Sequence, residues 1–252
     1  MRRRNRKARK GNRKARKVGR FGAGTVACGL LLAGPAAQVN AAELDTDLVV
    51  NGGFENVDTN QPGINGSVRI LDWSGVAGFA YNYGQNYDNG GPLAGGGTYY
   101  FTPNASLPDI TAPGQFFQDI DVSTGPSAAA IAAGLGQYNL SAFMSSYMDE
   151  GDFGSIHADF RDGVGSSLGF ALISDNDPST WTLVSASGLI PVNTATVRLS
   201  VFGTAIVGGP DGFVDNVLFS VSQVPEPSTA ALATIGLATA GLVRLRRRSN
   251  GP

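Results

Sequence analysis

Two carboxylates, Glu55 and Asp215, have the residue type and the sequence setting of metal ligands. Glu55 follows the turn Asn51-Gly52-Gly53-Phe54, and Asp215 lies in the run Gly212-Phe213-Val214-Asp215-Asn216-Val217. Ca²⁺ binds several oxygen atoms and combines carboxylates with backbone carbonyls, so acids beside a turn suit it. The alternative is that both carboxylates accept hydrogen bonds from backbone amides at strand ends. A shared site requires a fold that brings these distant residues together.

Three tyrosines, Tyr81, Tyr83 and Tyr87, are candidates for binding a sugar. They lie in residues 75–97, a segment rich in Gly, Asn and Tyr that is expected to be mainly loop. Exposed rings stack on the C–H faces of sugars, and neighbouring Asn and Asp side chains satisfy the hydroxyl groups. The alternative is that the rings cover the loop against the core, because aromatic side chains are usually buried for their area. Trp73 and Trp181 are expected in the core.

Catalytic chemistry is not indicated. His157 is the only histidine, at an outward position of a predicted strand, and one histidine excludes a histidine-rich zinc site. A glycosidase needs two carboxylates at a set separation, and no pair is marked out among the many acids. The acidic turns at 149–152 and 175–177 offer calcium ligands, but Asp and Asn also favour solvated hairpin tips. We therefore expect that the protein is not an enzyme.

Positive charge is confined to the two ends of the chain. Of 19 Lys and Arg, 12 lie in residues 2–20 and four in residues 244–248. Between residues 43 and 223 there are three arginines (Arg69, Arg161 and Arg198), no lysine and 19 acids, a net charge of −16. Such a domain repels itself unless salt or bound cations screen it. It has no electrostatic attraction for nucleic acid, which is not expected as a partner.

The N-terminal 41 residues have the organisation of a secretory signal peptide. A long basic region is followed by an apolar run at 21–33 and by the small residues of Val39-Asn40-Ala41, a candidate cleavage site. Cys28, the only cysteine, lies in this leader, so the mature domain is expected to have no disulfide. The protein is therefore expected to be exported.

The other targeting segment is the tail, residues 224–248. It contains Val224-Pro225-Glu226-Pro227, then an uncharged apolar run at 230–243, then a cluster of arginines. The 14 residues of this run fall short of the roughly 17–25 of a comfortable membrane span. The three parts, in this order, resemble the PEP-CTERM sorting signal that an exosortase processes; the alternative is an ordinary anchor helix. The resemblance implies a short apolar helix, exosortase and secretion machinery as partners, transient anchoring in the inner membrane, and release to the cell surface or extracellular matrix.

Residues 43–223 are expected to form one all-β domain, an antiparallel β-sandwich of the jelly-roll type. Short apolar or alternating runs with turn signals between them predict about ten strands and leave no helix long enough for a crossover. The Ala-rich segment 127–133 is expected to form one or two helical turns. The predicted strands are 48–50, 68–73, 98–101, 115–122, 137–148, 153–161, 167–173, 181–189, 194–202 and 213–221.

The runs around Glu55 and Asp215 resemble the motifs that open and close galactose-binding-like modules, including carbohydrate-binding modules. This resemblance implies a jelly roll, a structural Ca²⁺ held by Glu55 and Asp215, and a sugar ligand in some members. We therefore expect an exported, non-catalytic β-sandwich sorted by an exosortase and retained at the cell surface or in extracellular polysaccharide. Binding of carbohydrate or exopolysaccharide is a narrower hypothesis. The alternative is a secreted hydrolase acting on polysaccharide through an unrecognised carboxylate site.

Overall fold

The computed structural model describes residues 42–85, 91–148, 150–175 and 180–225. All of these residues belong to one compact unit, Asn40–Pro252. The signal-peptide segment 1–41 and most of the tail, including its expected apolar helix, lie outside the described residues. Within the described part of the chain, no helix is long and apolar enough to cross a membrane.

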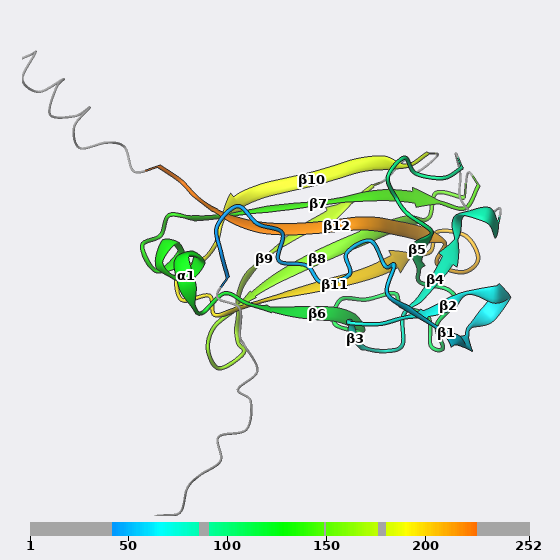
Figure 1. Ribbon diagram of the computed structural model, residues 1–252, viewed down its shortest axis with the longest axis horizontal. Helices are drawn as coiled ribbons and strands as arrows, with labels where there is room; N and C mark the ends of the chain where they lie inside the picture. Colours follow the sequence, from blue (N-terminus) through cyan, green and yellow to red (C-terminus); the bar gives the residue numbers. More distant parts are fainter. Residues whose placement is uncertain (1–41, 86–90, 149, 176–179, 226–252) are drawn as a thin grey trace, which may run out of the picture. The chain divides into compact units, whose positions relative to one another are not determined.

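The domain is a sandwich of two antiparallel sheets, which confirms the predicted fold class (Figure 1). The seven-stranded sheet has the order β1-β2-β4-β5-β12-β7-β10, and the five-stranded sheet has the order β3-β6-β11-β8-β9. The strands of the first sheet are β1 (Val57–Pro62), β2 (Val68–Ile70), β4 (Phe79–Asn82), β5 (Tyr99–Thr102), β7 (Gly136–Ser146), β10 (Thr182–Leu189) and β12 (Gly212–Gln223). Those of the second are β3 (Ser74–Gly75), β6 (Phe116–Asp121), β8 (Phe153–Arg161), β9 (Ser167–Ser174) and β11 (Thr196–Thr204). The helices are α1 (Gly125–Ala132) and two 3₁₀ turns, η1 (Ile64–Gly66) and η2 (Tyr83–Gln85).

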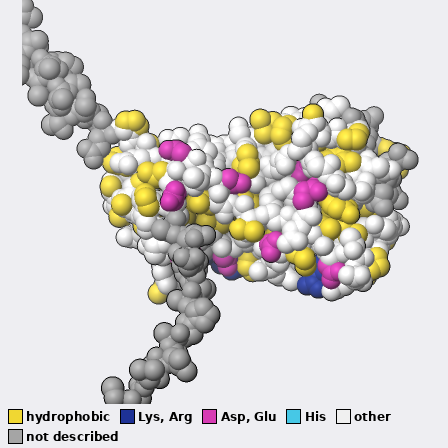
Figure 2. Space-filling view, viewed as in Figure 1, with side chains coloured by type: hydrophobic (Ala, Val, Ile, Leu, Met, Phe, Trp, Pro, Cys, Tyr) yellow, Lys and Arg dark blue, Asp and Glu magenta, His cyan; other side chains and the backbone are white. Residues whose placement is uncertain are grey.

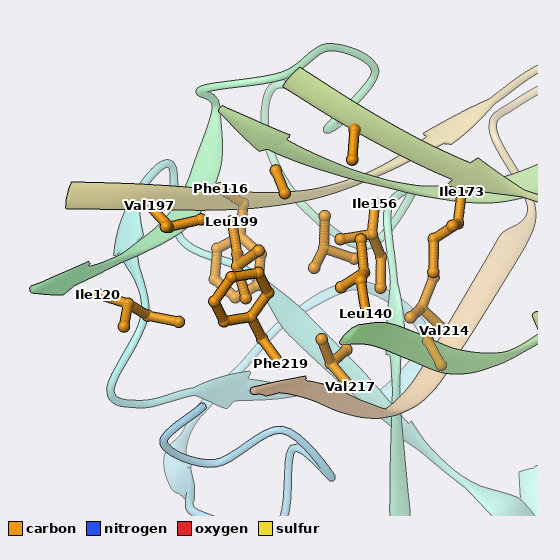
Figure 3. Close-up of a cluster of buried hydrophobic side chains, with 14 of the residues drawn as sticks. Phe116, Ile120, Leu140, Ile156, Ile173, Val197, Leu199, Val214, Val217 and Phe219 are labelled. Atoms are coloured by element: carbon orange, nitrogen blue, oxygen red, sulfur yellow. The ribbon is translucent and has the colours of Figure 1, made fainter. Parts of the chain in front are cut away.

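The core lies between the sheets and follows the period-two pattern of the sequence. Ile156, Ala158 and Phe160 of β8 are buried, as the alternation predicts, and so are Phe116 and Ile120 of β6. Figure 3 shows Phe116, Ile120 and Ile156 packed among apolar side chains of the other sheet. The labelled partners from that sheet are Leu140, Val214, Val217 and Phe219.

Three segments differ from the prediction. Residues 57–62 and 79–82 lie outside the predicted strands, the second within the segment 75–97 that is expected to be mainly loop, but they form β1 and β4. Most of β1 is exposed to solvent, and in β4 the adjacent residues Ala80 and Tyr81 are both buried. Neither strand therefore shows the alternation of apolar and polar residues by which strands are recognised. Residues 48–50 are not a strand; the Gln118 amide group instead donates to and accepts from the backbone of Val50, each at 2.9 Å.

The first described segment packs against the last strand. The Val217 amide donates to the Gly52 carbonyl at 2.9 Å, and a Cβ at Gly52 would lie 2.1 Å from the Val217 oxygen. Only glycine permits this approach without a shift of the backbone. The contact is made where β12 is irregular, between Asp215 and Leu218, and Asn216 adopts a left-handed φ of 49°. The opening and closing motifs therefore meet.

One end of the sandwich holds α1, the start of the described chain and its exit from β12 (Figure 1). The Ser127 amide donates to the Ala42 carbonyl at 3.2 Å, and the Val224 amide donates to the Leu135 carbonyl at 2.9 Å. We call this the exit end.

Candidate functional site

Asp215 is a buried carboxylate at the meeting point of the two motifs. Its side chain accepts hydrogen bonds from the Tyr83 hydroxyl at 2.6 Å and from the Asn216 amide at 2.7 Å. Burial raises the pKa of Asp215 to about 7, against the lowering effect of these two bonds, and the charge of Glu55 raises it further. Neither of the two ion pairs among the described residues involves Asp215.

Glu55 lies close to Asp215, across a glycine loop. Its Oε1 accepts the amides of Thr98 and Tyr99, each at 2.8 Å. A Cβ at Gly97 would lie 2.5 Å from this oxygen, and one at Gly96 would lie 2.7 Å from Asp215 Oδ2. The loop therefore presses its backbone against both carboxylates. Both accept backbone amides, as the alternative to a metal site expected, while the role of Glu55 and Asp215 as calcium ligands stays a prediction.

The tyrosines occupy different surroundings from those predicted. Tyr81 is 2% exposed and Tyr83 is 7% exposed, so the expectation of exposed rings is wrong for both. Both pack with Tyr100 and Phe213 in a second apolar cluster, because their large rings gain more from burial than a surface loop would provide. Tyr87 lies outside the described residues. Trp73 and Trp181 pack against the two core clusters, as expected.

A second group of acids comes together near the end opposite α1. Carboxylate oxygens of Glu150, Asp152 and Asp211 lie within 4.8 Å of one another. Asp152 already accepts three backbone amides, from Ile206, Val207 and Asp211, at 2.6–3.2 Å. Burial raises the pKa of Asp211 to about 6, and the charges of Asp152 and Glu150 raise it further. The group has the donor chemistry of a cation site, but its best-buried member already organises the loop.

The outer face of the five-stranded sheet carries three rows of side chains that run across β6, β11, β8 and β9. Because all four strands are antiparallel and in register, directly paired residues lie next to one another on this face. From one edge to the other, the rows are Asp119, Arg198, Asp159 and Phe170; Asp121, Thr196, Arg161 and Ser167; and Phe117, Ser200, His157 and Leu172. We call this surface the outer face.

The charged groups of the outer face hold one another in place. Arg198 donates to both oxygens of Asp119, at 2.7 and 2.6 Å, and its guanidinium lies 3.8 Å from the ring centroid of Phe117. The Asp119 hydrogen bond raises the pKa of Arg198. Asp159 accepts hydrogen bonds from Arg161 at 2.6 Å and Ser167 at 2.5 Å. Burial favours a raised pKa for Asp159, but these two hydrogen bonds outweigh it and lower the pKa.

An aromatic platform lies at the β9 edge of this face. The Phe170 ring is 66% exposed and stacks on His157, with ring centroids 4.9 Å apart and planes 27° apart. Burial lowers the pKa of His157, against the raising effect of Asp159, which favours the neutral form of the imidazole. The two rings form a rigid apolar surface beside charged neighbours.

A cleft of about 530 Å³ opens beside the charged rows, lined by Asp121, Arg161, Asp162, Thr196 and Arg198 among others. A cleft of about 740 Å³ lies on the other side of β6, between it and residues 42–50. Asp119 and Asp121 line both. The outer face therefore continues into concave surfaces on both sides of β6.

Sequence reasoning missed the outer face as a site, although it predicted His157, Asp159 and Arg161 to point outward. The period of two tells which side chains of each strand point outward. Only the order in which the strands pair places Arg198 beside Asp119 and Asp159. Sequence reasoning also passed over Gly165-Ser166-Ser167-Leu168-Gly169, which has the Gly-x-Ser-x-Gly spacing of a nucleophile elbow. In the structure it joins two antiparallel strands rather than a strand and a helix, and Ser167 donates to Asp159.

Residues 223–248 match the family model of the PEP-CTERM protein-sorting motif. The chain carries a PEP-CTERM sorting motif. It begins at Gln223, the last residue of β12, and contains the predicted sorting residues, of which Glu226 and Pro227 lie outside the described residues. The motif implies export, a C-terminal membrane anchor before processing, and processing by an exosortase.

Solved structures with a related fold include sugar-binding modules. The enzymatically active domain of tailspike protein 4 from bacteriophage CBA120 is 17% identical, with a TM-score of 0.41, over 69% of this chain and 21% of that chain. TmCBM61, solved in complex with β-1,4-galactotriose, is 13% identical, with a TM-score of 0.39, over 71% of this chain and 99% of that one. The CBM22-1–GH10 modules of the Clostridium thermocellum xylanase 10B, solved with xylohexaose, are 15% identical, with a TM-score of 0.37, over 70% and 29%.

This chain thus spans only about a fifth of the tailspike domain and less than a third of the xylanase modules. The low identities limit the likeness to the fold. No curated protein matches the chain.

The buried carboxylate predicts a pH dependence of stability in chelator. Because the pKa of Asp215 is raised to about 7 from its usual 3.8, the folded state binds a proton that the unfolded state releases. Stability should therefore be highest below about pH 4 with respect to this group and fall as the pH rises towards 7, by about 1.4 kcal/mol per unit of pKa shift. Asp215→Asn should remove this fall. Urea unfolding at pH 4 to 8 in chelator measures it, and an equal slope in the variant would contradict the assignment.

Proposed function

We propose that this protein is an exported, non-catalytic surface or matrix protein that binds polysaccharide through the outer face of its five-stranded sheet. The observation that carries the proposal is the exposed Phe170 ring, stacked on His157 and flanked by the row of Asp119, Arg198 and Asp159. Sugar binding requires an apolar platform for the ring face and fixed polar groups for the hydroxyls. The outer face combines the two.

The exposure of Phe170 and its stacking on His157 suit an aromatic platform for a sugar ring. Phe170 leaves two thirds of its surface exposed, and it is the only aromatic residue among the exposed large apolar residues of the described chain. Its stacking on His157 fixes the orientation of the ring before a ligand arrives, which reduces the ordering cost of binding. Leu172, also exposed, extends the apolar surface along β9.

The polar groups are pre-oriented in the same way. The bidentate pair of Arg198 and Asp119 holds both side chains in one plane, while each keeps exposed surface for a hydroxyl group. Arg161 and Asp159, which lie two positions apart on the neighbouring strand β8, form a second ion pair. The adjoining cleft of about 530 Å³ has the size of small-ligand sites, roughly 300–1,000 Å³.

The chemistry of the outer face favours binding over hydrolysis. A glycosidase needs a carboxylic acid that keeps its proton near neutral pH. Asp159 has the opposite tendency, because hydrogen bonds from Ser167 and Arg161 lower its pKa, and Asp119 is paired with Arg198.

The alternative, a polysaccharide hydrolase, is favoured by one observation elsewhere in the domain. The pKa of Asp211 is raised to about 6, and Asp152 and Glu150 lie beside it. A carboxyl group with a raised pKa beside other carboxyl groups is the arrangement of a general acid with a partner. Release of reducing ends from the glycans that the protein binds, abolished by Asp211→Asn, would support this alternative.

The sorting motif supplies the setting for a binding role. We propose that the exosortase recognises Val224-Pro225-Glu226-Pro227, that the apolar run holds the precursor in the inner membrane, and that processing releases the sandwich to the cell surface or the extracellular matrix. At the cell surface or in the extracellular matrix, a non-catalytic domain that binds polysaccharide would attach the protein to that polysaccharide.

We further propose a structural Ca²⁺ at Glu55 and Asp215. The two carboxylates lie at one meeting point of the chain ends, beside glycine backbone that can supply carbonyl oxygens, in a domain of net charge −16. A divalent cation there favours the ionised form of Asp215 and offsets the repulsion between the two acids.

The glycan site is tested by Phe170→Ala and Arg198→Ala. Each should weaken retention on insoluble xylan, galactan or cellulose, whichever the wild type binds, by about tenfold, which corresponds to about 1.4 kcal/mol. Leu183→Ala is the matched control, because Leu183 is 58% exposed on β10 in the other sheet. Equal losses in all three variants, or a wild-type protein that none of these polysaccharides retains, would refute the proposed site.

The sorting proposal is tested by replacing Pro225, Glu226 and Pro227 together with alanine. The apolar run remains, so the variant should accumulate as an unprocessed, membrane-held precursor, which immunoblotting of membrane and medium fractions detects. A variant in which only the arginines 244–248 are replaced controls for general loss of anchoring. Normal processing of the triple variant would show that the tail is only an anchor.

The calcium proposal is tested by thermal melts of the processed protein with chelator, with Ca²⁺, and with NaCl at equal ionic strength. Calcium at 100-fold above its Kd should stabilise the fold by about 2.7 kcal/mol. For a domain of this size that corresponds to roughly 5–10 °C. The shift should disappear in Asp215→Ala. Equal shifts with calcium and sodium would show that calcium acts only by screening.

A further inference from the structure

We propose that the exit end of the sandwich rests directly on the lipid bilayer while the tail anchors the precursor. The contact surface consists of four exposed apolar side chains at that end: Val164, Leu168, Leu189 and Val192. We call it the exit patch. This inference rests on the membrane anchor that the sorting motif implies, and it does not depend on glycan binding.

The tether between the fold and the membrane segment is short. The fold holds the chain as far as Val224, whose amide donates to the Leu135 carbonyl at 2.9 Å. The apolar run begins at Ala230, so only residues 225–229 lie between them. Five residues span at most about 18 Å when fully extended. The polar interface of one leaflet alone takes up roughly 5–8 Å of that length, so the exit end is confined to the membrane surface.

The exit patch surrounds the point from which the tether leaves. Leu189 pairs with Gln137, which on its other side pairs with Ser222 of β12. A Cβ at Gly134, the residue before Leu135, would lie 3.7 Å from a methyl carbon of Val192. Val164 lies in the β8–β9 turn, and Leu168 lies at the start of β9. A Cβ at the next residue, Gly169, would lie 3.6 Å from a ring carbon of Pro191.

The charge distribution favours this end over the rest of the domain. Residues 122–140 and 185–197, which include α1, the start of β7 and the end of β10, contain no charged residue, although residues 43–223 hold 19 acids and three arginines. The exposed positions of α1 are Gly, Pro and Ala. Figure 2 shows hydrophobic side chains gathered on the visible surface of this end. An uncharged, apolar surface loses less on approaching head groups than a hydrated acidic one does.

The acids beside the exit patch define the kind of lipid. Glu43 and Asp45 lie next to α1 and β12, and Asp162 caps the β8–β9 turn. An anionic lipid surface would repel these carboxylates, whereas the ammonium groups of zwitterionic lipids can pair with them. The partner surface is therefore a bilayer whose head groups are mainly zwitterionic.

The test compares two probe positions of equal exposure at opposite ends. Leu189 is 63% exposed in the exit patch, and Ile206 is 63% exposed in the loop near Asp152, away from α1. The full chain with Cys28→Ser and either Leu189→Cys or Ile206→Cys is labelled with an environment-sensitive fluorophore. It is then inserted into preformed vesicles of phosphatidylethanolamine and phosphatidylcholine.

The label at position 189 should be quenched by aqueous iodide severalfold less than the label at position 206, and both should be quenched equally in detergent. Inserting about ten Gly and Ser residues between Val224 and Pro225 adds roughly 17 Å of flexible reach. The insertion should reduce the difference in iodide quenching between the two labels. Equal quenching of the two labels in vesicles without the linker would overturn the proposal.

Discussion

The close approach of Gly52 to Val217 is the contact on which the rest of the domain depends. It joins the start of the fold to its last strand at the irregularity of β12, and a side chain at Gly52 would collide with the Val217 carbonyl. The same approach places Phe54 in the core, where it contacts Trp73 and Phe101, and sets Glu55 near Asp215. Residues 43–223 contain no cysteine, so no disulfide can join the two ends of the domain. The contact between Gly52 and Val217 joins them instead.

The scarcity of cations divides the surface into regions with different roles. Two of the three arginines between residues 43 and 223, Arg161 and Arg198, lie on the outer face, each in an ion pair with an aspartate. Elsewhere the carboxylates rely on backbone amides, as at Glu55 and Asp152, or on burial with a raised pKa, as at Asp215 and Asp211. At the exit end, α1 and the adjoining ends of β7 and β10 carry no charge, and the acids Glu43, Asp45 and Asp162 lie beside them. The sandwich thus has a polar aromatic face, an end that gathers carboxylates and an end with exposed apolar side chains.

Much of the fold could be predicted because the alternation of apolar and polar residues along a strand shows which side chains face the core. The long strands β7, β8, β11 and β12 show the period of two, and their inward residues form the core. The short strands β1 and β4 could not be found, because one is mostly exposed and the other has buried residues on both faces. The proximity of Glu55 and Asp215 followed from the jelly-roll topology. The burial of Tyr81 and Tyr83 did not follow, because residue type alone does not say whether a loop folds back onto the core. The outer face depends on cross-strand register, which no single segment of sequence contains.

The central claim is that the outer face is the surface on which this exported domain meets polysaccharide. Amide-resolved NMR of the processed protein, titrated with an oligosaccharide of the glycan that retains it, tests this claim most directly. Binding at the outer face predicts that the shift changes concentrate at outward positions of β6, β8, β9 and β11, centred on Phe170, Asp159 and Arg198. Changes concentrated instead around Tyr83 and Asp215, or around Glu150 and Asp211, would contradict it.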